Sequence, residues 1–318
     1  MRSLHGRMLR YLDEVARHGS IRGAATRLSV SASSINRQLL ALEAEMGVPL
    51  FDRLPNRLRL TAAGEALVAH IRRTLADHDR TAALIEEMRG AHGGTLTVAM
   101  MGGLGPELIA RTTLAARAAR PRMRLVFQRL SLPEILAAVR EGRADLGLAY
   151  GAEGQRGIAT LMAWECRLGA VMPPDHPLAG HASLRLADLL AARLVLPAEG
   201  MSLRPLVEAG LARGGLRPDP IVEANEVEVM KRVAVLAQGV TLLNRLNIQP
   251  EEARGDLAFV PIEDRALPSQ TLRLFTAERA AQPVLSGVFA EALRGVIEPM
   301  LAGQPNSNSA STSIGMSE

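Results

Sequence analysis

The chain has 318 residues, of which 47% are hydrophobic and 22% are charged, so its composition is that of a folded protein rather than a disordered or fibrous one. This length is enough for two or three domains. The net charge of +4 is concentrated at one end: the first 73 residues contain 12 arginines against 6 acidic residues, whereas residues 91–318 contain 23 residues of each sign. A basic segment attached to a neutral remainder indicates a polyanionic partner for the first part of the chain.

Cysteine use and hydropathy limit the compartment and the chemistry. The single cysteine, Cys166, excludes a disulfide framework and a cysteine-based metal site, and it suits a reducing compartment. We expect no signal peptide, because no apolar stretch follows a charged N-terminal region. The apolar run Val233–Leu243 is far shorter than the roughly 20 residues that span a bilayer. We therefore expect a cytoplasmic protein without a membrane partner.

The first sixty residues predict a helix-turn-helix and a wing. Apolar residues recur every three or four positions from Leu4 to Val15, which indicates a first helix that ends at Gly19. A second helix is expected over residues 21–28 and, after the tight turn Ser29-Val30-Ser31, a third over residues 32–46. One face of the third helix is apolar. The first two turns of its other face carry side chains of the kinds that bind base edges and phosphates, namely Ser33, Ser34, Asn36, Arg37 and Gln38.

A wing and a long helix are expected next. The pair Pro55-Asn56 favours a turn between two short strands, and Arg53, Arg57 and Arg59 stand on them. Thr61 caps a helix of roughly 28 residues, about 42 Å long, which is too long to be buried against so small a domain. Its apolar stripe therefore needs a partner. A second copy of the same helix is our main interpretation, and packing on the second domain is the alternative.

Four motifs follow one another without gaps over about residues 4–70. They are Ala24-Ala25-x-x-Leu28-x-Val30-Ser31, Ile35-x-Arg37-Gln38-Leu39-x-x-Leu42-Glu43, Gly47-Val48-Pro49-Leu50-Phe51-x-Arg53 and Leu60-Thr61-x-x-Gly64-Glu65. In these motifs the segment resembles the LysR-type transcriptional regulators. The resemblance implies a winged helix-turn-helix whose third helix enters the major groove of an operator in double-stranded DNA. It also implies a homodimer or homotetramer built through the long helix.

The resemblance places the DNA contacts of the third helix at Ala32, Ser33, Asn36 and Arg37, and the wing contact at Arg53. The residue pattern itself adds Ser34 and Arg57. In the family a glutamine is common where Ala32 stands, and a serine is common where Asn36 stands. Because alanine has no hydrogen-bonding group for a base edge and asparagine pairs with adenine, these departures leave the operator sequence open.

The second part of the chain predicts an α/β domain. Gly90-Ala91-His92-Gly93-Gly94 has the composition of a hinge. Strands expected at 96–100, 124–128 and 145–150 then alternate with helices expected at 107–119 and 133–141, which is the order of a parallel sheet. The motifs Gly142-x-x-Asp145-Leu146-x-Leu148, His176-Pro177-Leu178-Ala179 and Gly255-Asp256-Leu257 are similar to the effector domain of the same family.

The expected fold class is an N-terminal all-α winged helix-turn-helix with a long linker helix, followed by an α/β domain of two Rossmann-like subdomains that resembles periplasmic binding proteins. We expect the DNA-binding domain at 1–60, the linker helix at 61–89 and the hinge at 90–94. Effector subdomain I is expected at 95–163 plus 270–300, and subdomain II at 164–269. Residues 304–318 are polar and of low complexity, so we predict a disordered tail there.

Ligands of such domains bind at the carboxyl ends of the strands. By position, the expected effector contacts are Gly102, Gly103, Leu104, Ser131, Tyr150, Pro197, Ser202 and Asn225. Members of the family often hold an effector carboxylate with a serine or threonine in the first loop, where this chain has Gly102-Gly103. Either backbone N–H groups hold the ligand, or the pocket has a different specificity. For Tyr150, packing is the alternative interpretation.

The sequence shows no catalytic constellation. Gly102-Gly103-x-Gly105 lacks the spacing of a dinucleotide loop, no Walker-type loop occurs, and His176 and His181 have no carboxylate cluster near them. We therefore expect no enzyme, no cofactor and no metal. Our prediction is a DNA-binding transcriptional regulator with a small organic effector, and RNA polymerase is a candidate partner. The alternative, a ligand-binding module that works without DNA, is disfavoured by the basic segment and the missing signal peptide.

Overall fold

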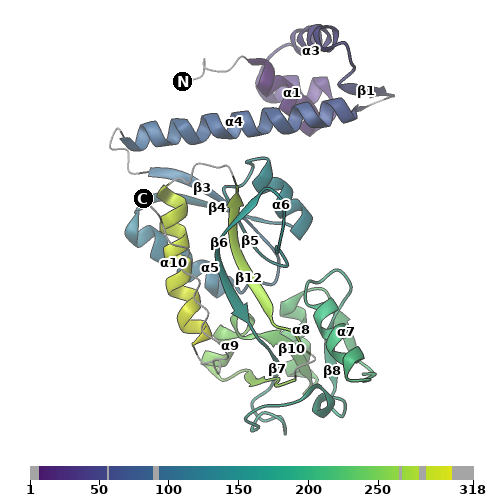
Figure 1. Cartoon of the computed structure of the whole chain (residues 1–318), viewed down its shortest axis with the longest axis vertical. Helices are drawn as coiled ribbons and strands as arrows, with labels where there is room; N and C mark the ends of the chain where they lie inside the picture. The colour runs from purple at the N-terminus through teal and green to yellow at the C-terminus, as the bar shows by residue number, and fades with distance from the viewer. Residues whose placement is uncertain (1–6, 56, 89–92, 265–266, 279–283, 303–318) are drawn as a thin grey trace.

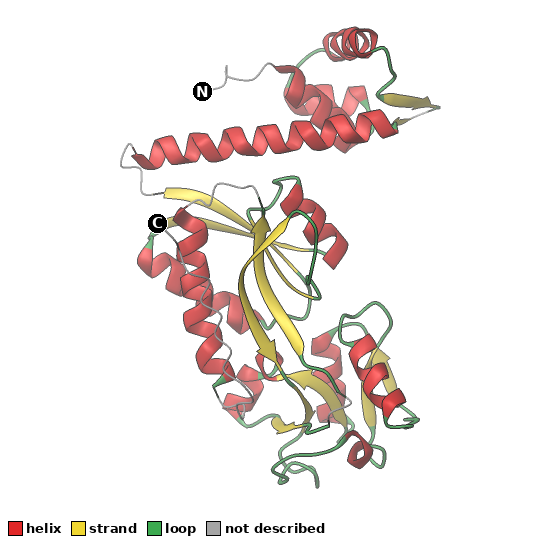
Figure 2. Ribbon diagram, viewed as in Figure 1, coloured by secondary structure: helices red, strands yellow, loops and turns green. Residues whose placement is uncertain are grey.

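The computed structural model describes residues 7–55, 57–88, 93–264, 267–278 and 284–302. A small helical unit lies at one end, a long helix runs beneath it, and two α/β units follow in line (Figure 1). Colouring by secondary structure shows one sheet in each of the two α/β units, with helices packed around it (Figure 2). The expected fold class is confirmed. The expected tail and residues 90–92 of the expected hinge lie outside the described residues.

The helical unit is a winged helix-turn-helix. Its elements are α1 (Arg7–His18), α2 (Ile21–Leu28), α3 (Ala32–Met46) and the antiparallel hairpin of β1 (Phe51–Leu54) and β2 (Arg57–Leu60). The bounds of α2 and α3 are those expected from their capping residues. Ser29 adopts a left-handed conformation at φ 55°, and the Val30 N–H donates to the Ala25 carbonyl, so the chain reverses between α2 and α3 without a longer loop.

Glu43 and Gly64 fasten the wing to the helices. The Glu43 carboxylate accepts hydrogen bonds from the backbone N–H groups of Leu50 and Phe51, at 2.7 and 3.2 Å. The Thr61 hydroxyl donates to the Pro49 carbonyl, at 2.8 Å, and accepts from the Gly64 N–H. A Cβ atom at Gly64 would overlap the Leu50 carbonyl oxygen, so this helix position requires glycine. Glu43 and Gly64, which belong to the LysR-like motifs, therefore have structural roles in this unit.

Only the first half of helix α4 (Ala62–Met88) packs against the winged helix. Val68 and Ile71 are buried, and Ile71 belongs to the core of the helical unit. The second half extends beyond that unit (Figure 1), where Ile85 is 36% exposed. Helix α4 also contacts the first strand of the α/β domain. The structure is therefore consistent with both interpretations of its apolar stripe, pairing with a second copy of the helix and packing on the α/β domain.

Subdomain I is built on a five-stranded sheet of order β4-β3-β5-β12-β6. Its strands are β3 (Gly93–Met100), β4 (Arg122–Arg129), β5 (Leu146–Tyr150), β6 (Ile158–Cys166) and β12 (Gln270–Ala277). Strands β4, β3 and β5 are parallel as expected, whereas β12 runs antiparallel to both of its neighbours. Helices α5 (Pro106–Ala119) and α10 (Val284–Leu301) cover one face, and α6 (Leu132–Arg140) covers the other.

Subdomain II repeats this plan with the order β11-β7-β10-β8-β9. Its strands are β7 (Leu168–Met172), β8 (Leu194–Pro197), β9 (Val222–Ala224), β10 (Val240–Asn244) and β11 (Ala258–Pro261). The helical elements are η1 (Leu186–Leu189), α7 (Arg204–Arg213), α8 (Val227–Leu236), η2 (Arg245–Asn247) and α9 (Gln249–Arg254). Strand β9 ends the sheet at one edge, which leaves α7 beside an open sheet margin.

The chain crosses between the two sheets twice. It leaves subdomain I at the end of β6, passes Arg167 and enters β7, and it returns between β11 and β12. The boundary expected at 163 therefore falls inside β6, because the strand stays paired with β12 up to Cys166. Gly93 and Gly94, which we expected in the hinge, begin β3 and pair with β4.

The contact at Gly64 leads to a prediction. We expect Gly64→Ala to lower the free energy of unfolding of the helical unit by about 1–3 kcal/mol, because the added methyl meets backbone rather than a movable side chain. Gly287→Ala in α10 is the matched control: nothing lies within 4 Å of its Cβ position, so we expect no loss and a gain of up to about 1 kcal/mol. Urea unfolding followed by circular dichroism measures both. Equal effects of the two substitutions would contradict the packing argument.

Candidate functional sites

The start of α3 presents polar groups to solvent. Ser31 caps the helix by accepting a hydrogen bond from the Ser34 N–H, at 3.2 Å, and the Ser33 hydroxyl donates to Ser31. Ser33 and Arg37 are exposed, and Ser34 and Asn36 are half-buried. Ala32 is half-buried and packs against the core of the helical unit. The predicted contact residues thus share the first two turns of one helix, with Ala32 turned partly inward.

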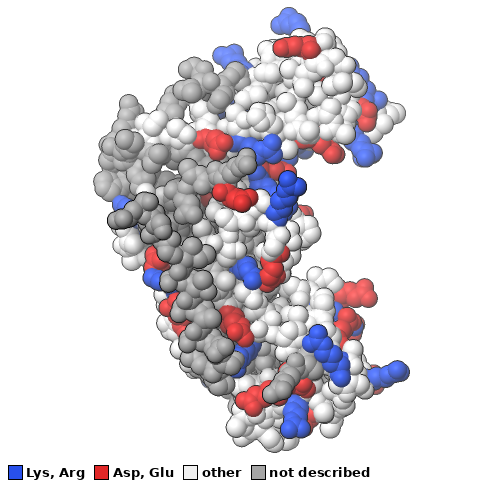
Figure 3. Space-filling model, in the orientation of Figure 1, with Lys and Arg blue, Asp and Glu red and all other residues white. Residues whose placement is uncertain are grey.

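The wing adds positive charge beside this helix. Arg53, Arg57 and Arg59 are exposed, and among the described residues only Arg53 has a carboxylate near it, with 4.0 Å between its guanidinium and Glu43. On the face drawn in Figure 3, charges of both signs are mixed over the two α/β units. Arg37 of the helix and Arg57 and Arg59 of the wing are therefore cationic groups without an ion-pair partner among the described residues, which is the kind of group that binds a phosphate backbone.

The first cleft loop follows β3 and is fixed by subdomain II. Gly103 has φ +86°, its carbonyl accepts a hydrogen bond from the Asn247 side chain, and a Cβ here would lie 3.0 Å from Val227. Leu104 is 6% exposed and belongs to the core of subdomain I. This loop therefore bridges the two subdomains. Gly103 lies where ligand and hinge would meet, whereas Leu104 holds the loop from inside.

Arg129 lies over Gly102, a contact that the sequence pattern did not suggest. Its strand β4 pairs with β3 so that Arg129 stands opposite Met100 at the carboxyl ends of both strands. The Arg129 guanidinium nitrogens lie 2.6 Å from the position of a Cβ at Gly102, so the movable end of this side chain occupies the space that a side chain at position 102 would take. Arg129 is exposed, and no carboxylate pairs with it in the described part of the chain. Glycine, which stands where the family often has a hydroxyl residue, thus leaves room for this position of the guanidinium.

Ser131 follows β4 and caps α6. Its hydroxyl donates to the Glu134 carboxylate, at 2.6 Å, and the Ser131 N–H donates to the same oxygen, at 2.9 Å. These two hydrogen bonds lower the pKa of Glu134. The Ser131 oxygen keeps a lone pair for an external donor, but its proton is engaged inside the capping box.

Tyr150 joins the two sheets at the hinge. The Asn244 side-chain amide donates to the Tyr150 hydroxyl, at 2.9 Å, and to the side-chain oxygen Oε1 of Gln270, at 3.2 Å. All three residues are nearly inaccessible, with at most 6% exposed. Burial raises the pKa of Tyr150 well above its ordinary value. The structure thus gives Tyr150 a hinge contact, in line with the packing alternative, and its role as an effector contact stays a prediction.

Three further expected contacts lie on subdomain II. Pro197 is buried at the end of β8, and its carbonyl accepts a hydrogen bond from Arg204, at 2.9 Å. Ser202 is half-buried in the turn before α7, and Asn225 is exposed between β9 and α8. These residues lie on the loops at the strand ends, as the sequence predicted. Among the described residues they do not line one common cavity, so their role as a single effector site also stays a prediction.

Within the described residues, no group of three or more histidine, cysteine, aspartate or glutamate side chains is arranged to hold a metal ion. No helix among them is long and apolar enough to cross a membrane.

Comparisons with known proteins agree on one family. Residues 7–65 match the model of the bacterial regulatory helix-turn-helix proteins of the lysR family, and residues 89–298 match that of the LysR substrate binding domain. The probable RuBisCO transcriptional regulator of Synechocystis sp. is 27% identical over 80% of this chain and 76% of its own. The dual regulator OxyR of Escherichia coli is 28% identical over 80% and 84%.

Solved structures show the same fold. A full-length OxyR variant from Pseudomonas aeruginosa superposes with a TM-score of 0.74, at 23% identity, over 94% of this chain and 98% of its own. Full-length CbnR in complex with its target DNA superposes with a TM-score of 0.61, at 24% identity, over 91% and 99%.

Cys166 yields a prediction about thiol reactivity. The residue is fully buried, and burial raises the pKa of its thiol to about 12. Since only the thiolate reacts, we expect labelling of the native chain by a disulfide reagent to be slow at pH 7 and to keep accelerating up to about pH 10. The chain unfolded in guanidinium is the control: its labelling rate should level off near pH 9, as for an ordinary thiol. Rapid native labelling at pH 7 would contradict the burial of this group.

Proposed function

Since the chain belongs to the LysR family of DNA-binding transcriptional regulators, we propose that it reads an operator with α3 and its wing and responds to a small anionic effector held between its two subdomains. The observation that carries the proposal is the pairing of a basic winged helix with an α/β domain whose cleft loops are tied to a hinge. A ligand-binding module acting without DNA would have no use for the exposed arginines of the first domain.

Arg37 and the wing support the DNA-reading part. Arg37 projects from the exposed face of α3, on the second turn, where a helix in the major groove presents its side chains to base edges. Arg53 and Arg57 project from the two strands of the wing, within reach of the adjacent phosphates or of the minor groove. Asn36, half-buried on the same helix, is suited to pairing with an adenine.

Arg129 supports an anionic effector. A guanidinium at the carboxyl ends of two parallel strands lies where α/β domains bind ligands. It offers bidentate hydrogen bonds to a carboxylate, and no described side chain competes for them. Gly102 and the start of α5 follow β3 directly in the chain, so they also lie at the carboxyl end of this strand. We therefore favour a small carboxylate, with Arg129 in the role that a serine or threonine of the first loop has in other members of the family.

A bound molecule suits this chain better than oxidation as the signal. Some relatives are named hydrogen peroxide-inducible genes activators. In this chain the one cysteine is buried and its pKa is raised to about 12, so it lacks the exposed thiolate that peroxide attacks.

Arg72 of α4 supports a direct connection between sensing and reading. Its guanidinium lies 2.7 Å from Asp13 of α1 and 3.5 Å from Glu141 at the end of α6. Asp13 is 5% exposed, and Glu141 is also paired with Arg143, at 2.7 Å. A movement of α6 would therefore change how Arg72 divides its interactions between the two domains. We propose this contact as one route by which the effector alters the angle of the DNA-binding unit.

Oligomerisation follows from α4. Its second half stands clear of the winged helix and exposes Ile85, so a second copy of the helix is the occupant that suits this surface. A homodimer or homotetramer places two winged helices on one operator, and a change of their relative angle would alter the bend of the DNA and the access of RNA polymerase.

Arg37 provides the test of DNA recognition. We expect Arg37→Ala to weaken operator binding by about 1–3 kcal/mol, because a bidentate base contact is lost. The measurement is a gel shift with the intergenic DNA beside the gene, at fixed salt. Arg120→Ala, which removes a half-buried arginine at the end of α5 in the α/β domain, is the control and should leave the affinity unchanged. An unchanged affinity of Arg37→Ala would reject its role, and the absence of any salt-sensitive complex would reject the function.

Arg129 provides the test of the effector class. We expect small mono- and dicarboxylates to include ligands that raise the melting temperature of the full chain, and Arg129→Ala to weaken their binding about tenfold or more. Gly102→Ala should have a smaller effect, because its methyl meets only the movable end of the Arg129 side chain. Arg120→Ala is again the control. Carboxylates that bind Arg129→Ala as tightly as the unaltered chain would contradict the assignment, while leaving DNA binding untouched.

A further inference from the structure

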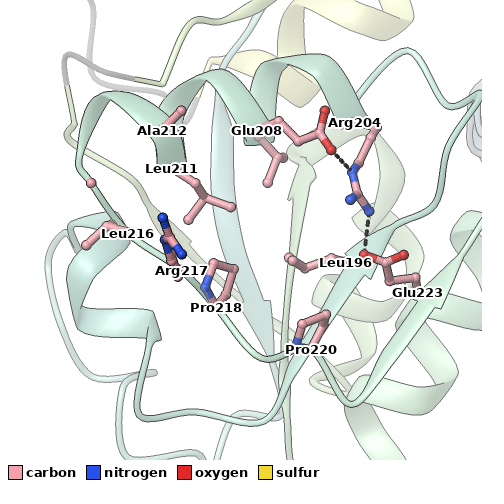
Figure 4. Close-up of a pocket in the computed structure, with 12 residues that line it drawn as sticks. Leu196, Arg204, Glu208, Leu211, Ala212, Leu216, Arg217, Pro218, Pro220 and Glu223 are labelled. Carbon is pink, nitrogen blue, oxygen red and sulfur yellow. Dashed lines mark hydrogen bonds and ion pairs between the residues drawn. The ribbon is translucent and has the colours of Figure 1, made fainter.

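A second cavity lies outside the cleft, between α7 and the open margin of the sheet in subdomain II. It has a volume of about 560 Å³, within the range of ligand pockets, and its walls are mostly apolar: Leu196, Val207, Leu211, Leu216, Pro218 and Pro220. Figure 4 shows five of them, Leu196, Leu211, Leu216, Pro218 and Pro220, around the space between α7 and the segment that leads into β9. None of them was predicted as a binding residue.

Of the two arginines that line this cavity, one is paired with carboxylates and the other is not. Arg204 is paired with Glu208, at 2.6 Å, and with Glu223, at 2.5 Å, so one cation holds both carboxylates. These hydrogen bonds raise the pKa of Arg204. Arg217 stands on the Pro218 side of the cavity, away from Arg204 (Figure 4). It is exposed, and the described residues provide no carboxylate for it. The four charged side chains of the cavity therefore sum to zero but are separated: Arg204 with its two carboxylates carries a net charge of −1, and Arg217 carries +1 next to an apolar wall.

The cavity is connected to the effector cleft through α7. Arg204 is the first residue of that helix, and it also donates a hydrogen bond to the Pro197 carbonyl in the loop at the end of β8. Ser202 and Leu203 join that loop to the helix. A ligand bound between α7 and the sheet would shift the helix, and with it the loop after β8 that contains predicted effector contacts.

We propose that this cavity is a second ligand site, which takes a small amphipathic carboxylate with its apolar body against Leu211 and Leu216 and its anionic group on Arg217. Binding there modulates the cleft through Arg204 and the loop after β8. A cationic ligand would have to share Glu208 and Glu223 with Arg204, whereas the Arg217 guanidinium has no carboxylate partner among the described residues. The site is independent of Arg129, so it stands or falls separately from the proposed effector.

The experiment compares three probes that share one apolar body: 3-phenylpropanoate, its neutral amide and 3-phenylpropylamine. Titration calorimetry on the full chain measures their affinities. We expect the carboxylate to bind, the amide and the amine to bind about tenfold more weakly or not at all, and Arg217→Ala to weaken the carboxylate by about tenfold. Arg217→Lys should restore much of the affinity, because it restores the charge.

Arg129→Ala distinguishes the two sites. The proposal requires that it leave 3-phenylpropanoate binding unchanged. Loss of binding in Arg129→Ala but not in Arg217→Ala would place the probe in the cleft and overturn the second site. Equal binding of the amide, tighter binding of the amine, or no binding of any probe by the unaltered chain would also overturn it.

Discussion

The amide of Asn244 is the group on which the arrangement of the α/β domain depends. It lies at the end of β10 in one sheet and donates hydrogen bonds to Tyr150 and Gln270, which belong to the other sheet. Because all of these groups are buried, an alternative arrangement of the two sheets must replace both hydrogen bonds or lose stability. The same segment continues to Asn247, which holds the first cleft loop at Gly103. Hinge and cleft are therefore one connected structure.

This connection gives a physical reason for a ligand to act at a distance. In the proposed site, a carboxylate on Arg129 would touch a loop whose other end is tied to the hinge, and a shift of subdomain I would reach the DNA-binding unit through Glu141 and Arg72. The effect of a ligand on such an equilibrium equals its difference in affinity for the two arrangements. The separation of charge along the chain fits this proposal, since the arginines of the wing would bind phosphates while the neutral domain would select the ligand.

The sequence was most informative where structure is set locally. Ser20, Ser31 and Gly47 cap their helices, so the bounds of α2 and α3 followed from residue types alone. The expectations were less accurate where pairing between strands distant in the sequence determines the bounds of an element. The register of β12 extends β6 to Cys166, and no pattern within residues 158–166 marks that end. The sequence did not predict a role for Arg129, because its contact with Gly102 arises only when β3 and β4 lie side by side. The cavity beside α7 was not predicted for the same reason: it depends on how this helix packs against the edge of the sheet in the folded chain.

Hydrogen–deuterium exchange of the full chain, with and without operator DNA, tests the coupling of reading and sensing most directly, because it needs no knowledge of the effector. Coupling between two sites is reciprocal, so if a ligand in the cleft changes DNA binding, DNA must change the cleft. We predict slower exchange at residues 31–37 and in the wing, together with altered exchange at residues 101–105 and 244–248. A change confined to the winged helix would contradict the coupling.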